Sequence, residues 1–152
     1  RVHQPFGYLT PEDLEPKDAD IDRLKQFLDQ RRLITTRLFV NAPAYRWVAA
    51  QVQVRARIGM ETAVSQQILA RLYQFLNPLA GGANGMGWPF GRELFVSDVY
   101  QCLQGIPDVQ FIRSVTLYVT SPGSGPQGEP EESVKLVEHG MIVSGKHEVI
   151  FV

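Results

Sequence analysis

The side chains that most often bind metals are few and scattered in this chain. The three histidines, His3, His139 and His147, lie far apart in the sequence, and none has the spacing of a helical metal site. The single cysteine, Cys102, excludes an intrachain disulfide and most cysteine-based metal centres, because these need a second thiol. We therefore expect no metal and no cofactor.

Residues that could carry nucleophilic or acid–base catalysis are also poorly placed. Cys102 lies on the apolar row of a predicted short helix, where a thiol is generally buried and unreactive. No Gly-x-Ser-x-Gly elbow is present. The acidic pairs Glu12-Asp13 and Glu131-Glu132 lie in polar segments, where nothing would raise the pKa of a carboxyl group. We expect a protein that is not an enzyme and has no small-molecule substrate.

A glycine-rich stretch, Gly85-Met-Gly-Trp-Pro-Phe-Gly91, is similar at first sight to a phosphate-binding loop. However, its glycines do not have the Gly-x-Gly-x-x-Gly spacing, and it follows a predicted helix rather than a strand. Pro89 also removes one backbone donor. We interpret the stretch as a structured loop, in which glycines permit tight turns while Trp88 and Phe90 are buried as anchors.

Charge is unevenly distributed along the chain. The formal net charge is −1, but residues 1–22 carry −4, residues 23–71 carry +7 and residues 72–152 carry −4. The near-neutral total argues against a general nucleic-acid binder, which usually has a strong basic excess. Eight of the nine basic residues in the central segment are arginines, namely Arg23, Arg31, Arg32, Arg37, Arg46, Arg55, Arg57 and Arg71.

Arginine favours protein interfaces, because its planar guanidinium pairs with carboxylates and its stem packs on apolar surface. Arg37, Arg55 and Arg57 are therefore candidate interface residues. The alternative function is a small α+β RNA-binding module with an Arg-rich sheet face, although such a face usually also exposes aromatic rings. A sheet face that is merely solvated is a third interpretation.

Apolar periodicity predicts the elements that would position these residues, within a length of 152 residues that suits one domain. The predicted helices cover residues 18–32, 61–76 and 97–106, with Ser97 as the N-cap of the last; the predicted strands cover 33–41, 45–58, 114–119, 134–143 and 148–152. The order of these elements predicts an α+β fold. We expect an antiparallel or mixed sheet, two to three helices packed on one face, and a C-terminal β-hairpin.

Proline and glycine divide the chain into regions. The stretch Ser121–Pro130 has no apolar residue to bury and is typical of a flexible surface loop. We expect an N-terminal extension (1–17), an α+β domain (18–120), a flexible Pro/Gly-rich loop (121–133) and the C-terminal hairpin (134–152).

The run from Leu72 to Arg92 carries a family resemblance. Its helix ends in an apolar-Phe-Leu-x-Pro-Leu pattern, which is followed by Gly-Gly and then by Gly-Trp-Pro-Phe-Gly-Arg. The matching residues of the loop are Pro78, Gly81, Gly82, Gly87, Trp88, Pro89, Phe90, Gly91 and Arg92. With Arg32-Leu-Ile-Thr-Thr-Arg37 upstream and Ile106-Pro-Asp-Val109 downstream, they resemble the C-terminal region of the baseplate J-like family over residues 18–120.

This resemblance implies assembly rather than catalysis. Members of the family build the baseplate wedge of contractile phage tails and injection systems, in several copies around the central hub and spike. The expected partners are other wedge subunits, copies of the chain itself, the hub and spike, and sheath-proximal proteins, without nucleic acid or membrane insertion. Assembly would take place in the bacterial cytoplasm, and the chain would become part of the particle. The missing N-terminal Met fits the end of a longer polypeptide, and residues 121–152 match nothing in the family pattern.

Overall fold

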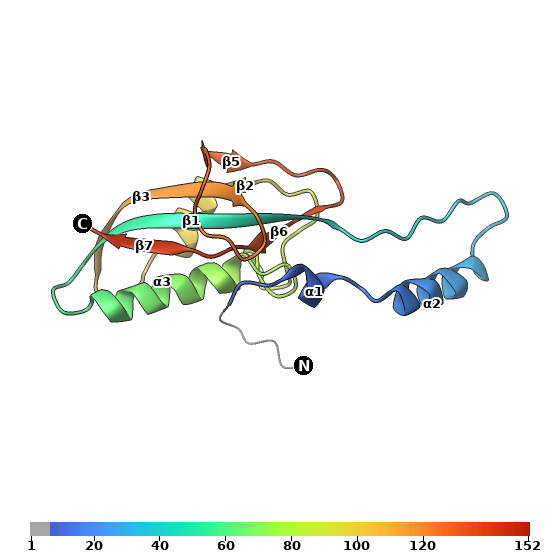
Figure 1. Cartoon of the computed structure of the whole chain (residues 1–152), viewed down its shortest axis with the longest axis horizontal. Helices are drawn as coiled ribbons and strands as arrows, with labels where there is room; N and C mark the ends of the chain where they lie inside the picture. Colours follow the sequence, from blue (N-terminus) through green and yellow to red (C-terminus); the bar gives the residue numbers. More distant parts are fainter. Residues whose placement is uncertain (1–6) are drawn as a thin grey trace.

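The computed structural model describes residues 7–152, which begin with two helices and end with five strands in succession (Figure 1). The helices are α1 (Pro11–Leu14), α2 (Asp18–Asp29), α3 (Glu61–Phe75) and α4 (Val96–Cys102). The strands are β1 (Ala44–Ala56), β2 (Leu94–Phe95), β3 (Val109–Thr120), β4 (Pro130–Glu131), β5 (Ser133–Val134), β6 (Gly140–Ser144) and β7 (Glu148–Phe151). The α+β class expected from the sequence is confirmed.

The main sheet is mixed and is built around β1. Its strand order is β4-β3-β1-β6, with β7 also paired to β1. β1 runs antiparallel to β3, from the pair Trp47–Thr120 to the pair Ala56–Val109. On its other edge, β1 pairs in parallel first with β6 and then with β7. Two further short strands, β2 and β5, form a separate antiparallel pair.

The two C-terminal strands lie close to where the sequence predicts them, but they do not form a hairpin with each other. Both run in the same direction as β1, whereas the strands of a hairpin run in opposite directions. β1 is 13 residues long, which is enough to pair with both in succession. Residues 145–147 connect β6 to β7. The backbone N–H of Gly145 donates to the Val48 carbonyl oxygen at 2.8 Å, so this connection also follows the edge of β1.

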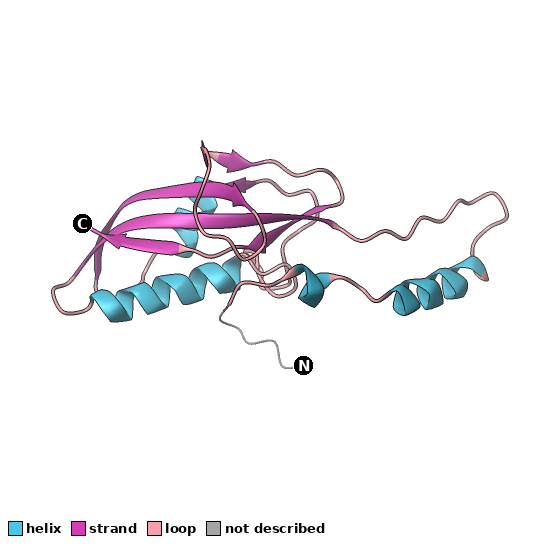
Figure 2. Ribbon diagram, in the orientation of Figure 1, coloured by secondary structure: helices cyan, strands magenta, loops and turns pink. Residues whose placement is uncertain are grey.

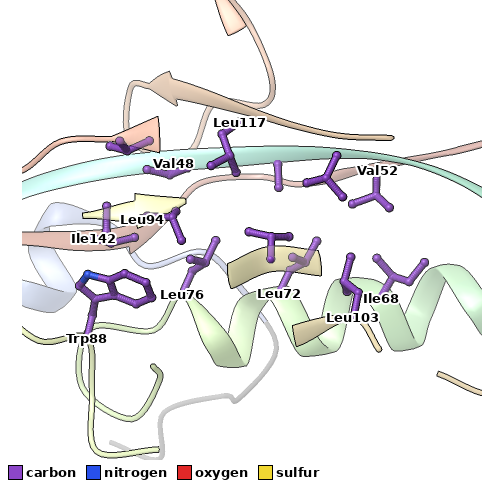
Figure 3. Packing of buried hydrophobic residues seen from close by; sticks show 14 of the residues in the cluster. Val48, Val52, Ile68, Leu72, Leu76, Trp88, Leu94, Leu103, Leu117 and Ile142 are labelled. Carbon is purple, nitrogen blue, oxygen red and sulfur yellow. The ribbon is translucent and has the colours of Figure 1, made fainter. Parts of the chain in front are cut away.

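The core lies between the sheet and the helices α3 and α4 (Figure 3). Alternate residues of β1, from Val48 to Val54, are fully buried, as expected from the period-2 pattern. One row of α3 is also fully buried: Val64, Ile68 and Leu72. The helical periodicity of residues 61–76 is therefore confirmed, and its apolar row covers the sheet.

The N-terminal extension is attached to the beginning of β1. The Trp47 indole Nε1–H donates to the Leu9 carbonyl oxygen, and the Tyr45 hydroxyl donates to the Leu14 carbonyl oxygen, both at 3.1 Å. Leu14 is buried. The expected extension therefore docks on the sheet over residues 7–14, while His3 lies outside the described residues.

Residues 15–43 form what we call the arm, which projects away from the sheet (Figures 1 and 2). It contains α2 and a long returning segment, and none of its residues is buried. The helix predicted over 18–32 exists, although it ends at Asp29 and packs on no part of the sheet. The strand predicted over 33–41 is wrong: Leu38, Phe39 and Val40 are in neither helix nor strand, because no other strand lies beside them to complete a ladder.

Other predicted boundaries also differ: β3 begins at Val109 rather than at residue 114, and α4 ends at Cys102 rather than at residue 106. β1 ends at Ala56 rather than Ile58, because the chain turns at residues 57–60 into α3 and leaves Ile58 93% exposed. The N-cap of α4 is Phe95 rather than Ser97. Asp98 explains the shift, because its carboxylate accepts a hydrogen bond from the Phe95 backbone N–H at 3.0 Å and so caps the helix one turn from its start.

The Pro/Gly-rich segment 121–133 is attached to the sheet at several points. Its Ser124 carbonyl oxygen accepts from the Lys146 backbone N–H at 3.0 Å, and its Gly125 carbonyl oxygen accepts from the Thr120 hydroxyl at 3.1 Å. The short strand β4, which the sequence did not predict, pairs with β3. The flexibility of this segment stays a prediction.

Within residues 7–152, no helix has both the length and the apolar character needed to span a membrane.

The two amphipathic helices α2 and α3 differ in what they stabilise, and a matched pair of substitutions tests this. Ile68→Ala removes a fully buried side chain and should lower the free energy of unfolding by about 2–5 kcal/mol. Leu24→Ala, on the 46% exposed side chain of α2, should change it by less than about 0.5 kcal/mol. Urea denaturation of dilute protein measures both, and equal losses would show that α2 packs on the sheet.

Candidate interaction site around the glycine-rich loop

The loop that carries the family resemblance begins at the C-terminal end of α3. The Gly82 backbone N–H donates to the Phe75 carbonyl oxygen at 2.7 Å, and the Gly81 N–H donates to the Asn77 carbonyl oxygen at 2.9 Å. A Cβ atom at Gly81 would lie 2.4 Å from both of these carbonyl oxygens. The turn therefore needs glycine at this position, because the backbone passes too close for any side chain.

The same loop folds back on itself and buries Trp88. The Trp88 backbone N–H donates to the Pro78 carbonyl oxygen at 3.2 Å, and its indole Nε1–H donates to the Arg92 carbonyl oxygen at 2.9 Å. Its ring meets Phe75 edge-on, with 5.6 Å between the ring centroids. Trp88 is 2% exposed, so the prediction that it anchors the loop is confirmed (Figure 3).

Arg92, the last residue of the motif, connects the loop to α4. Its guanidinium lies 2.9 Å from an Asp98 carboxylate oxygen and 5.1 Å from the centre of the Trp88 ring. Asp98 also caps α4, so one carboxylate holds both the arginine and the helix start. The carboxylate partner of Arg92 is therefore in its own chain.

Phe90 is a correction, because it is 60% exposed rather than buried. The Gly91 N–H donates to the Gly140 carbonyl oxygen at 2.9 Å, and Gly91 has a positive φ of 67°. These features tie the backbone to β6 and leave Phe90 on the outside. Phe90 borders a hollow of about 350 Å³, together with Phe39 and Pro43 at the base of the arm. Leu79 and Met86 of the loop are also exposed.

A second hollow, of about 420 Å³, lies between the loop, α3 and α4. Two guanidinium groups line it, but both are already engaged: Arg92 with Asp98, and Arg71 with the carbonyl oxygens of Cys102 and Gln104 at 3.1 and 2.7 Å. The Cys102 thiol donates to the Arg71 carbonyl oxygen at 3.7 Å. Burial raises the pKa of this thiol to about 11, although Arg71 opposes the shift, so Cys102 is a protonated thiol at neutral pH.

The three candidate interface arginines do not form one patch. Arg37 lies on the arm, which joins the first residue of β1, while Arg55 and Arg57 lie at the other end of that strand. A 13-residue strand separates the two places by roughly 40 Å. Arg57 pairs with Asp108 at 3.1 Å, and Arg55 donates to the Val152 carbonyl oxygen at 3.3 Å. This dispersed arrangement gives the RNA-binding alternative no support.

One polar cluster escaped the sequence analysis. Ser144 and His147 are both buried, and the Ser144 Oγ lies 2.7 Å from the His147 Nε2. The His147 ring also contacts Tyr73, with 4.8 Å between the ring centroids. The only signal for this pair was a Ser-Gly-Lys-His turn between two apolar runs. Among residues 7–152, no group of three His, Cys, Asp or Glu side chains is arranged to hold a metal ion.

This Ser–His pair has the wrong polarity for nucleophilic catalysis. The Ala50 backbone N–H donates to the His147 Nδ1 at 3.0 Å, so Nδ1 carries no proton. A neutral ring must then carry its proton on Nε2, which donates to the Ser144 Oγ. A general base would instead accept the serine proton at that nitrogen. Burial lowers the pKa of His147 to about 3, and the neutral ring acts as a structural connection between β1 and the C-terminal strands.

The loop anchor can be tested with two neighbouring aromatic residues. Trp88→Ala should lower the free energy of unfolding by about 3–5 kcal/mol, because it removes a buried ring. Phe90→Ala, two positions away, should change it by less than about 0.5 kcal/mol, because that ring is already exposed to water. Chemical denaturation compares the two, and a small effect of Trp88→Ala would mean that the loop contributes little to the fold.

The buried His147 makes stability depend on pH. Because its pKa is near 3 in the folded chain and near 6.5 in the unfolded chain, its contribution is present above pH 6.5 and is lost as the pH falls. Between pH 6.5 and 5 we expect the free energy of unfolding to fall by about 1.5 kcal/mol. His147→Gln should remove this slope, while His139→Gln, at an exposed position, should keep it. Unfolding curves at several pH values measure it, and equal slopes in all three proteins would refute the assignment.

No protein-family model and no curated protein matches this chain.

Proposed function

We propose that this chain is a structural subunit that acts through protein–protein contacts, in the baseplate wedge of a contractile phage tail or injection system. The observation that carries the proposal is the arm, in which no residue is buried although it contains several large apolar side chains. Leu33 is 74% exposed, Ile34 is fully exposed and Phe39 is 77% exposed. Exposed apolar side chains gathered on one projecting segment are typical of a surface that binds another protein.

The glycine-rich loop, whose Phe90 borders a hollow at the base of the arm, supports the same proposal. It carries the residues that resemble the baseplate J-like family, and its Trp88 and Arg92 are held inside the fold. Their neighbours Met86 and Phe90 are exposed. The loop thus combines a fixed backbone with apolar side chains that face outward, which suits a preformed binding edge. In this proposal the partners are other wedge subunits, further copies of the chain, the hub and spike, and sheath-proximal proteins.

The proposal also rests on the chemistry of the polar groups in the fold. The Cys102 thiol is protonated and His147 donates its proton to Ser144, so neither supplies an activated nucleophile. We propose a protein without enzymatic activity that assembles in the bacterial cytoplasm and remains part of the particle.

Reconstitution of the particle tests this function. The chain, carrying an affinity tag, is expressed with the genes of its own particle, and the purified particles are analysed by quantitative mass spectrometry. We expect the chain in a fixed ratio to the wedge and hub proteins, and no sheathed particles when it is deleted. Normal particles that lack the chain would overturn the proposal.

Two matched variants locate the contact within the same experiment. Ile34→Asp places a charge on the arm, and Ile58→Asp places one on an equally exposed side chain at the far end of β1. We expect Ile34→Asp to reduce incorporation of the chain into particles, because burial of an unpaired aspartate carboxylate in an interface costs free energy. Ile58→Asp should be incorporated normally. Equal incorporation of both variants would mean that the arm is not a contact surface.

A further inference from the structure

The helix α2 has an apolar row without a partner in the described chain. Its apolar residues, Ile21, Leu24, Phe27 and Leu28, have helical spacing. Leu24 is 46% exposed and Phe27 is 53% exposed. The Arg31 guanidinium lies 3.7 Å from the centre of the Phe27 ring. Ile21 and Leu28 are half-buried, and no residue of the row is fully buried.

The returning segment of the arm does not cover this row. A groove of about 610 Å³ separates α2 from the returning segment, where Leu38 and Phe39 line it. The residues of α2 that line the groove are polar: Lys25, Gln26, Asp29 and, just beyond the helix, Arg32. Because α2 presents polar side chains to its own chain, its apolar row faces a different direction.

The charges on α2 are arranged in two blocks. Three acidic residues, Asp18, Asp20 and Asp22, lie in its first turns and carry −3; residues 23–32 carry four basic residues and one acidic residue, and therefore +3. Acidic residues in the first turns would also stabilise α2 without a partner, because negative charge is favourable at the N-terminal end of the helix dipole. The dipole does not explain the exposed apolar row, however. Two such helices side by side in opposite directions would place each acidic block against a basic block, with the apolar rows between them.

We propose that α2 packs antiparallel against α2 of a second copy of this chain, through the row Ile21, Leu24, Phe27 and Leu28. The inference rests on the proposed function, and it identifies a second copy as the partner of the arm. An antiparallel contact is self-complementary, because each acidic block meets the partner's basic block. A parallel contact would place acidic blocks together and basic blocks together. The 12-residue helix is marginal alone, so burial of its row also stabilises the helix itself.

Two charge-reversal variants test the contact. Asp20→Lys/Asp22→Lys changes the formal net charge of residues 18–32 from 0 to +4, and Arg31→Glu/Arg32→Glu changes it from 0 to −4. Analytical ultracentrifugation of the 152-residue chain measures self-association over a range of concentrations. We expect the unchanged chain to dimerise, and each variant alone to associate at least roughly tenfold more weakly, because like charges meet. An equimolar mixture of the two variants should restore a one-to-one dimer.

A matched control keeps the result specific. Glu131→Lys/Glu132→Lys makes the same change of charge at exposed residues outside the arm and should leave dimerisation unchanged. Because α2 packs on no part of the sheet, the arm variants should keep the urea midpoint of the unchanged chain, which shows that they fold.

Several outcomes would overturn the antiparallel contact. These are an unchanged chain that stays monomeric at all concentrations, a dimer that survives both reversals, and a mixture of the two variants that stays monomeric. Binding of the unchanged chain to lipid vesicles in place of dimerisation would also overturn it. None of these outcomes bears on incorporation into the particle, which the mass-spectrometry experiment measures separately, so the two proposals can fail independently.

Discussion

The rest of this fold depends on the pairing of β1 along both of its edges. One edge pairs with β3, which is antiparallel, and the other pairs with β6 and β7, which are parallel. These pairings set the register in which Val48, Val52 and Val54 face α3. A slip by one residue would turn these side chains to the other face of the sheet, so the buried face and the pairing specify each other.

The glycine-rich loop extends this arrangement to the remaining elements. It leaves α3, reaches β6 through the bond between Gly91 and Gly140, and reaches α4 through the pair of Arg92 and Asp98. Trp88 fills the space between these connections. The body of the protein is thus closed by contacts within the chain, whereas the arm has no buried residue. This contrast is why we propose that the internal motif residues stabilise the fold and that the arm is the binding surface.

Much of the body could be predicted from the sequence, because burial there follows simple periodicity. The alternation of β1 and the helical row at Val64, Ile68 and Leu72 each place apolar side chains on one face, and that face is buried. The strand predicted at Leu38 and Phe39 was wrong, and both side chains are exposed. Apolar character indicates that a side chain gains from burial, but it does not show which surface covers that side chain. The same reasoning also placed Phe90 inside, since a local pattern does not show which way a turn directs a side chain.

The polar connections could not be predicted, because they join residues that are distant in sequence. Asp98 is close to Arg92 along the chain, but its double role depends on where α4 begins. His147 meets Ala50, 97 positions away, and only the parallel pairing of β1 with the C-terminal strands brings them together. The sequence therefore indicated no catalytic residue here, and the geometry gives a physical reason to exclude this Ser–His pair as one.

The parallel pairing of β1 also has a consequence for how the chain folds. One edge of β1 can be completed only by residues 140–151, which follow it by nearly a hundred positions. Contacts between such distant segments form slowly, because the chain loses the conformational entropy of a long loop before the strand pairing lowers its free energy. Until then, β1 presents open hydrogen-bonding groups beside its buried apolar face. This exposed edge is where a newly made chain is most vulnerable to mispairing with a neighbouring chain before the sheet is complete.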